Sequence, residues 1–297
     1  KVLGDYRSKE GILSPNSRSV GRKKSLDDYK VIQDSLTFNL NASFQHFSHY
    51  YESSITALCC SVWLRWDLGV KTQIFGGNEV VTRWKDQSGN SNDFIQATST
   101  KQPSYEYEDT TNGYPYLNFD GTDDFMKCVN NSIDGTGDSL DRAISIFYIA
   151  KTNAATTGAL ISLNKDNASY AQIDINARVD SGSSFWNNFL EDSSDNESSY
   201  IYTTNVLNTT GVYGLTMKAN GLMKSFYNGS MVATTNNPSF TPEAYRSVYP
   251  IMLAAANSTT PTNFLNAQIQ EIMIFDKELT TDEALYLSKY LQHKYNI

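Results

Sequence analysis

Short runs of β-type residues recur from residue 31 onward, and clusters of Gly, Asn, Ser and Pro separate them. Leu36, Phe38 and Leu40 alternate with polar residues, a pattern typical of a half-buried strand. The apolar run 144–149 predicts a central strand, and Asn228 with Gly229 predicts a tight hairpin turn. Further strands are predicted at 62–64, 80–81, 159–163, 170–175, 212–218, 223–227, 248–255 and 269–275. The pattern predicts an all-β fold, a two-sheet antiparallel sandwich.

One amphipathic helix is predicted at the end of the sequence. Thr280 and Glu283 have the spacing of a capping box, and the helix is predicted to continue to about Lys294. Acidic residues near its beginning and basic residues near its end suit the helix dipole. Apolar side chains share one face at positions i, i+3 and i+4, namely Leu287, Tyr290 and Leu291. We expect this short helix to pack on the sandwich.

Residues 1–30 differ in charge from the rest of the chain. They hold eight Lys and Arg against four Asp and Glu, a formal charge of +4, whereas residues 31–297 carry −12. This segment has too few apolar side chains to offset the entropy of ordering. We predict an extended basic arm at 1–30 that docks on an assembly partner and a single sandwich domain at 31–297; the alternative is an unattached terminus. The partner-binding residues expected in the arm are Arg18, Arg22, Lys23 and Lys24.

Composition and charge exclude several classes of protein. An acidic body is repelled by nucleic acid and by anionic lipid, so neither is expected as a partner. No apolar stretch approaches the roughly 20 residues that span a bilayer, so membrane insertion is not expected. The cysteines, Cys59, Cys60 and Cys128, fit neither a disulfide framework nor a metal motif.

Three segments together resemble the concanavalin A-like, laminin G-like domains of bacterial and phage surface proteins. They are WKDQSGN at 84–90, NGYPYLNFDGTDD at 112–124, and QIQEIMIFD at 268–276 followed by the capped helix. The resemblance covers about 210 residues and implies a jelly-roll sandwich. The residue chemistry agrees with turns, because Gly89 and Gly121 tolerate positive φ while Asp86 and Asp120 can accept bonds from nearby backbone amides.

Catalytic residues are not evident. Polysaccharide hydrolases of this fold carry an E-x-D-x-E strand, since retaining hydrolysis needs two carboxyl groups about 5 Å apart. That motif is absent, the acidic segment 106–109 lies among turn residues, and Glu271 and Asp276 have the wrong spacing. His46 and His49 lack an evident third metal ligand. We therefore predict that the protein is not an enzyme.

Calcium is the cofactor that the sequence favours most. Laminin G-like sandwiches often hold Ca²⁺, and hard cations prefer clustered oxygen ligands. One candidate loop offers Asp86, Ser88, Asn90 and Asp93, and a second offers Asp120, Asp123 and Asp124. The same residue types are also favoured simply as turn formers.

A glycan site is the other candidate. Glycan-binding proteins stack sugars on exposed aromatic rings and bond sugar hydroxyls with amides. The segment Phe185, Trp186, Asn187 and Asn188 offers these groups, and Ser-rich flanks on both sides suggest a protruding hairpin. The alternative is a buried Trp in a strand.

These features favour a non-enzymatic structural or adhesive protein of a virus particle, such as a phage head decoration, fibre or tail component. The arm would attach to other virion proteins and the lectin-like sandwich would face outward at the virion surface, as a homo-oligomer or within a larger assembly. One alternative is an extracellular glycan-binding module of a bacterial surface protein. A polysaccharide hydrolase is a further alternative.

Overall fold

The computed structural model describes residues 60–128, 130, 143–155, 157–164, 172–180, 183–191, 197–201, 206–218, 222–236, 250–256 and 260–297. They all belong to the unit Thr56–Ile297, one of two into which the chain divides. The arm predicted at 1–30 and the strand predicted at 36–40 lie outside the described residues. The domain boundary placed at residue 30 therefore stays a prediction.

The first layer of the fold is built around two long central strands, β8 (Ile144–Thr152) and β17 (Asn266–Phe275), which pair with each other. On the far side of β8 lie in turn β13 (Gly211–Met217), β14 (Leu222–Tyr227) and β15 (Ser230–Asn236). On the far side of β17, its first half pairs with β6 (Tyr116–Asp120) and its second half with β1 (Cys60–Arg65). Every one of these pairings is antiparallel.

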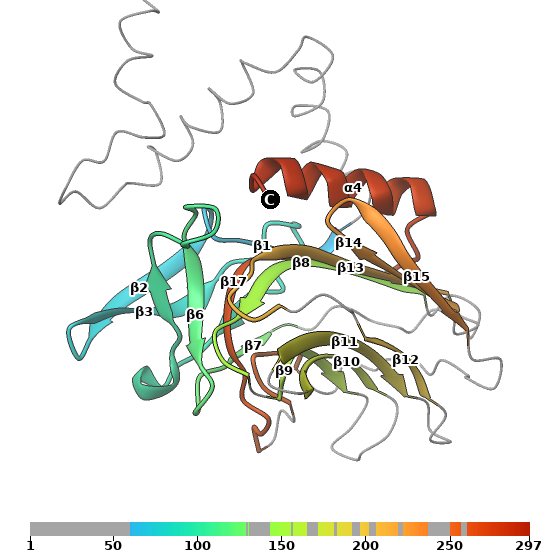
Figure 1. Cartoon of the computed structure of the whole chain (residues 1–297). Coiled ribbons are helices and arrows are strands. Elements are labelled where there is room, and N and C mark those ends of the chain that lie inside the picture. The colour runs from blue at the N-terminus through green and yellow to red at the C-terminus, as the bar shows by residue number, and fades with distance from the viewer. Residues whose placement is uncertain are drawn as a thin grey trace, which may run out of the picture. The chain divides into compact units, whose positions relative to one another are not determined.

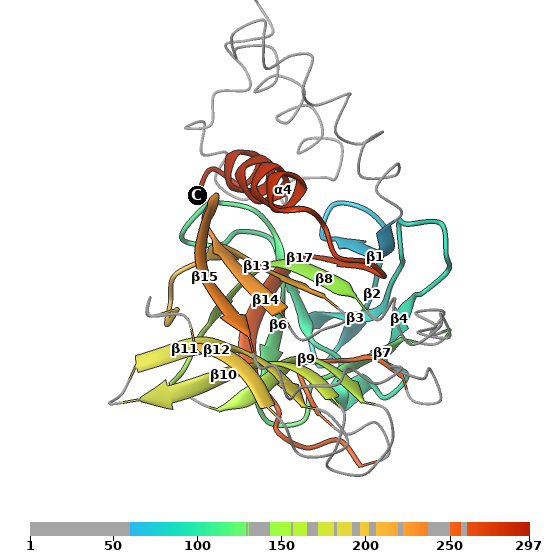
Figure 2. The same cartoon turned by 90° about the vertical axis from the view of Figure 1, so that its right-hand side faces the viewer.

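The second layer runs in the order β12 (Glu197–Ile201), β11 (Ser183–Glu191), β10 (Gln172–Asp180), β9 (Gly158–Asn164), β16 (Met252–Leu253), β7 (Met126–Cys128) and β4 (Phe94–Ile95). The strand β3 (Asn78–Trp84) pairs with β4, with β2 (Val70–Phe75) and with β5 (Ser104–Glu106), and β5 pairs with β6. β3 therefore joins the two layers, which Figures 1 and 2 show one above the other.

The core lies between the layers. Every residue of β8 is buried, and alternate ones, Ile144, Ile146 and Tyr148, join the core cluster with Ile161 and Trp186 from the second layer. Because strand side chains alternate in direction, the other residues of β8 point to the opposite face. That face is also buried, which requires a cover on the outside of the sandwich.

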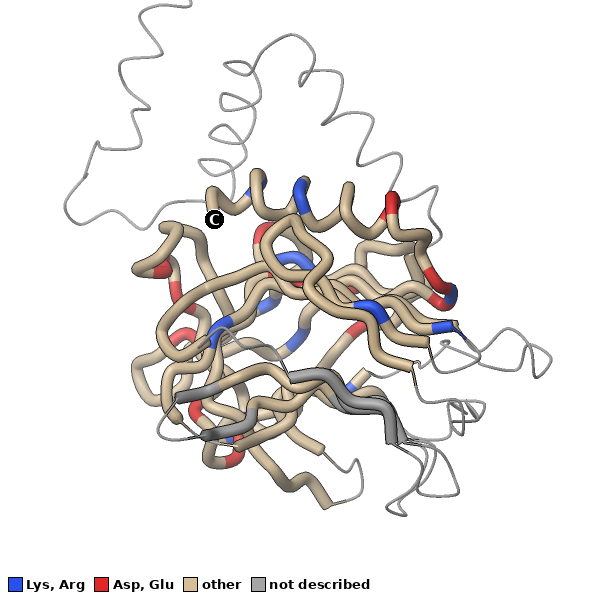
Figure 3. The backbone as a smooth tube through the Cα atoms, turned by 45° about the vertical axis from the view of Figure 1, so that its right-hand side comes forward, with Lys and Arg blue, Asp and Glu red and all other residues tan. Residues whose placement is uncertain are grey.

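The helix α4 (Thr281–Lys294) supplies much of this cover, lying over β13, β14 and β15 (Figure 1). Its capping box is confirmed: Thr280 Oγ1 accepts a bond from the Glu283 amide at 3.3 Å, and Glu283 Oε2 accepts one from the Thr280 amide at 2.7 Å. Leu287 and Leu291 are buried. Figure 3 shows acidic residues at the beginning of the helix and basic residues toward its end, as the dipole favours.

The hairpin predicted at Asn228 and Gly229 is also confirmed, between β14 and β15. Both residues have positive φ, 40° and 76°, which a type I′ turn requires. The Gly229 amide donates to Ser288 Oγ of α4 at 2.9 Å. The turn thereby fixes the hairpin against the helix.

The predicted fold class is confirmed in its described part as an all-β antiparallel sandwich with a short C-terminal helix. Within that part of the chain, no helix has the length and apolar character needed to cross a membrane.

Candidate functional site

Asp86 is the first residue of the first predicted calcium loop, which follows β3. Its side chain is buried and connects this loop to β1. Its Oδ1 accepts bonds from the amides of Trp63 and Ser88 at 2.8 and 2.9 Å. Its Oδ2 accepts bonds from Ser88 Oγ at 2.6 Å and from the Asn92 amide at 3.0 Å. The donors of three residues thus satisfy both oxygens of this buried carboxylate.

The other predicted ligands of this loop are also committed to protein contacts. Asp93 accepts a bond from the Asp86 amide at 2.8 Å and pairs with Arg83. Asn90 turns its amide nitrogen toward the Cys60 and Ser61 carbonyls, at 3.1 and 3.3 Å. These contacts tie the loop to β1, and calcium at this loop stays a prediction.

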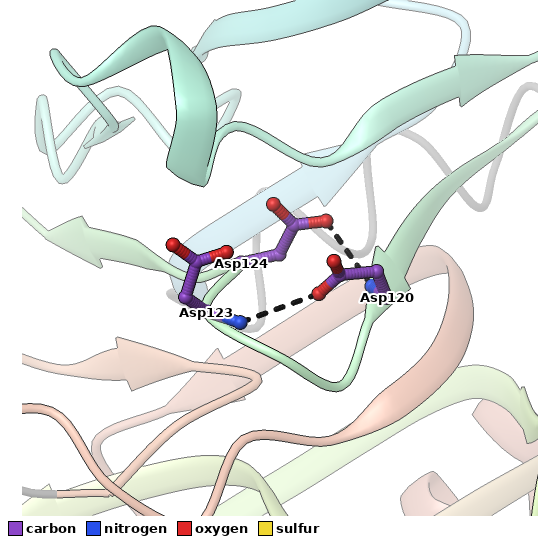
Figure 4. Close-up of side chains that lie close together, drawn as sticks. All are labelled: Asp120, Asp123 and Asp124. Atoms are coloured by element: carbon purple, nitrogen blue, oxygen red, sulfur yellow. Dashed lines mark hydrogen bonds between the residues drawn. The ribbon is translucent and has the colours of Figure 1, made fainter.

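The second predicted calcium loop does gather its carboxylates. Asp120, Asp123 and Asp124 each place an oxygen within 4.8 Å of the others (Figure 4). Asp120 Oδ1 accepts bonds from the amides of Thr122 and Asp123, at 2.7 and 3.3 Å, as the predicted Asx-turn requires. Asp124 Oδ2 accepts a bond from the Asp120 amide at 3.1 Å. Among the described residues, this is the one acidic group with the geometry to share a cation.

Asp124 is the most perturbed carboxyl of this loop. Its side chain is largely removed from water, and this burial, followed by the negative charge of Asp120, raises the pKa of Asp124 to about 7. Asp123 adds a smaller effect in the same direction. The carboxyl is therefore partly protonated near neutral pH in the folded protein.

The predicted glycan-stacking residue is not at the surface. Trp186 is 0% exposed, and its ring contacts Tyr148 and Tyr213 edge-on, at centroid distances of 5.8 and 6.0 Å. Asn187 and Asn188 are buried as well, while Phe185 is half-buried. The exposed arrangement expected for Trp186 is wrong, because β11 turns this side chain into the core. The alternative, a buried Trp in a strand, holds.

Two buried ion pairs were not evident from the sequence. Lys151 Nζ lies 2.6 Å from Asp109 Oδ1, and the other Asp109 oxygen accepts a bond from Thr210 Oγ1. All three side chains are buried. Burying a lone charge is costly, so a lysine on the outer face of β8 needs an acid in the segment that covers it.

The second pair lies beneath the end of α4. Glu271, on β17, accepts bonds from Lys294 Nζ and the Tyr295 hydroxyl through Oε2, and from Trp63 Nε1 at 2.7 Å through Oε1. Burial, together with the adjacent Glu271 charge, raises the pKa of Tyr295 well above its ordinary value. Both carboxylate oxygens of Glu271 are therefore occupied by structural partners, and the tyrosine stays a hydrogen-bond donor.

The fold and these contacts define a β-sandwich whose buried polar residues serve the structure. No family model and no curated protein matches the chain. Among solved structures, it is similar to the ligand-binding domain of botulinum neurotoxin serotype D in complex with N-acetylneuraminic acid. The identity is 14% and the TM-score 0.53, over 80% of this chain and 52% of that one.

Two further structures are similar at the same level. The binding domain of Paraclostridial Mosquitocidal Protein 1 has 10% identity and a TM-score of 0.53, over 80% of this chain and 53% of that one. Botulinum neurotoxin type C, which depends on two ganglioside molecules to enter cells, has 16% identity and a TM-score of 0.51, over 81% and 53%. The chain spans about half the length of these structures, and the likeness shows a shared β-sandwich fold.

The raised pKa of Asp124 predicts a pH-dependent stability. Its ordinary value is 3.8 and its folded value about 7, so the stability contributed by the protonated form is fully present below about pH 4. It is lost as the pH rises through 7. Asp124→Asn should therefore raise the free energy of unfolding by about 1 to 3 kcal/mol at pH 8 and leave it nearly unchanged at pH 4.

Chemical denaturation at the two pH values measures this difference. Asp123→Asn, on a less buried neighbour, is the matched control and should give a smaller change at pH 8. Equal destabilisation by Asp124→Asn at both pH values would contradict the assignment.

Proposed function

We propose that this chain is a non-enzymatic adhesive module whose sandwich binds glycans on a cell surface. The observation that carries the proposal is the fold, which it shares with toxin binding domains. One of those was solved with N-acetylneuraminic acid, and another belongs to a toxin that uses two gangliosides.

The absence of an evident catalytic pair in the sequence agrees with this proposal. The buried carboxylates of Asp86, Asp109 and Glu271 are each surrounded by protein donors. A general acid or base must reach a substrate proton directly or through one water. Carboxylates committed to turns and ion pairs suit a scaffold.

A finer proposal concerns where the module works. The resemblance to concanavalin A-like, laminin G-like domains supports display on a virus particle, as a head decoration, fibre or tail component within a larger assembly. The basic arm, with Arg18, Arg22, Lys23 and Lys24, would attach it to acidic surfaces of other virion proteins. The alternative is a module of a bacterial surface protein, which would need no particle to bind.

Calcium is proposed at the second acidic loop. Asp120, Asp123 and Asp124 offer oxygens close enough to share one Ca²⁺. The ion would offset the repulsion from Asp120 and Asp123, which adds to burial in raising the pKa of Asp124. It would also stabilise the 120–124 turn.

Calcium should therefore raise the melting temperature at pH 8. At a Ca²⁺ concentration one hundred times its Kd, the free energy of unfolding should rise by about 2.7 kcal/mol. Asp123→Asn should remove most of the shift, whereas Asp282→Asn, an exposed acid on α4, should leave it intact. A melting temperature that does not change when Ca²⁺ or EDTA is added would contradict the proposed calcium site.

The central proposal predicts glycan binding without turnover. The full chain, applied to an array of neutral and acidic glycans, should bind a defined subset, and incubation with those glycans should release no reducing sugar. Failure to bind any glycan would overturn the adhesive role, and released sugar would favour the hydrolase.

The arm prediction separates folding from attachment. Deleting residues 1–30 should leave the melting temperature almost unchanged but abolish incorporation into the particle, because the arm contributes contacts to a partner and little to the core. Reversing the charges of Arg18, Arg22, Lys23 and Lys24 should weaken attachment more at low salt than at high salt. Normal occupancy of the truncated protein would place the interface on the sandwich.

A further inference from the structure

Three basic side chains form a row across four neighbouring strands. Lys71 on β2 lies directly opposite Arg83 on β3, Arg83 opposite Ile95 on β4, and Ile95 opposite Lys127 on β7. Residues directly opposite each other in an antiparallel sheet project from the same face. The row covers three inter-strand spacings, about 14 Å.

This face is the outer one. The adjacent row, formed by Trp84, Phe94 and Cys128, points into the core, so the basic row points the other way. Lys71, Arg83 and Ile95 are exposed, and Lys127 is half-buried. Ligands in solution can therefore reach the row without any rearrangement of the sheet.

A fourth basic residue lies near the row, beside Phe125, which directly precedes β7. Lys101, in the short 3-10 helix η1 (Ser99–Lys101), places its Nζ 5.9 Å from the Phe125 ring centroid. Lys127 places its Nζ 5.4 Å from the same centroid. Two ammonium groups thus share one aromatic ring, each with a modest cation-π attraction.

The arrangement concentrates positive charge on an acidic protein. Asp93 pairs with Arg83, and the four basic residues outnumber it. Like charges placed directly opposite on a sheet are destabilising, as Lys71 and Arg83 are. Partial burial, and then the nearby charge of Lys101, lower the pKa of Lys127. An anionic ligand along the row would offset this repulsion.

The chemistry of the row selects among anions. Its centre is an aliphatic side chain, Ile95, which is 38% exposed and suits the apolar face of a sugar ring. Single-stranded nucleic acid is held by exposed aromatic side chains that stack on its bases. The aromatic ring at this end, Phe125, is only 7% exposed. A chain of acidic sugars fits both the spaced charges and the aliphatic centre.

We propose that the outer face of β2, β3, β4 and β7 binds an acidic glycan, whose carboxylate or sulfate groups pair with Lys71, Arg83, Lys101 and Lys127. This inference rests on the proposed adhesive function and names the class of ligand. The remaining acidic surface would orient the module by repelling polyanions from its other faces.

Calorimetric titration of the full chain with a sulfated heparin oligosaccharide and with oligosialic acid tests the proposal. Lys71→Glu with Lys101→Glu should weaken binding of at least one of them about ten-fold or more, and the remaining affinity should depend less on salt. The control, Lys218→Glu with Lys289→Glu, makes the same change in net charge at exposed positions elsewhere and should leave the affinity within about two-fold. If the first pair lowers the melting temperature, Lys71→Gln with Lys127→Gln tests the same face without adding acids.

The remaining outcomes separate this inference from the proposed function. Binding of neutral dextran oligosaccharides but of neither acidic probe would overturn the acidic-glycan site and leave the adhesive function standing. Equal loss of affinity in the control pair would overturn the site as well. Tighter binding of single-stranded DNA of matched charge would overturn the glycan assignment. Failure of every glycan to bind would overturn both proposals.

Discussion

The pair of strands β8 and β17 has to be covered on both faces, and the rest of the described sandwich is arranged to do this. All nine residues of β8 are buried, and all but two of the ten in β17. The second layer covers one face through Ile161 and Trp186. On the other face, α4 covers part of the surface and the polar segment around Asp109 covers another. Burying apolar surface on both sides supplies most of the stabilisation.

The outer cover is unusual because it includes buried charges. Asp109 pairs with Lys151, and Glu271 pairs with Lys294 and Tyr295. The free energy lost when two charges are removed from water is nearly as large as the free energy gained from their attraction. Such pairs therefore add little net stability. Removing one partner of a pair, in contrast, leaves the other as an uncompensated buried charge and destabilises the fold. These pairs therefore fix where the loop and the helix end sit on the sheet.

Local patterns predicted the turns and caps well. The capping box at Thr280, the turn at Asn228 and the Asx-turn at Asp120 each depend on residues within three or four positions of one another. The apolar runs also located the central strands. Such features are visible in a sequence because their energies arise from neighbours along the chain.

Features set by distant contacts could not be predicted. The ion pairs join residues 42 and 23 positions apart, and no local pattern marks them. Trp186 lies in a segment rich in Ser and Asn, yet the pairing of β11 turns it inward. Three of the six residues in the edge strand β2 are polar, and they do not alternate with apolar residues. The sequence pattern therefore did not predict this strand. The basic row exists only because the strand register brings Lys71, Arg83 and Lys127 into line.

We infer that α4, the polar segment around Asp109 and the β8–β17 pair unfold as one cooperative unit. Native-state hydrogen exchange of the full chain, followed by mass spectrometry under increasing denaturant, measures the opening energy of each segment. We expect amides in β8, β17 and α4 to exchange through the same global opening, while those in β2 exchange earlier. Opening of α4 at a clearly lower free energy, with β8 and β17 still protected, would contradict it.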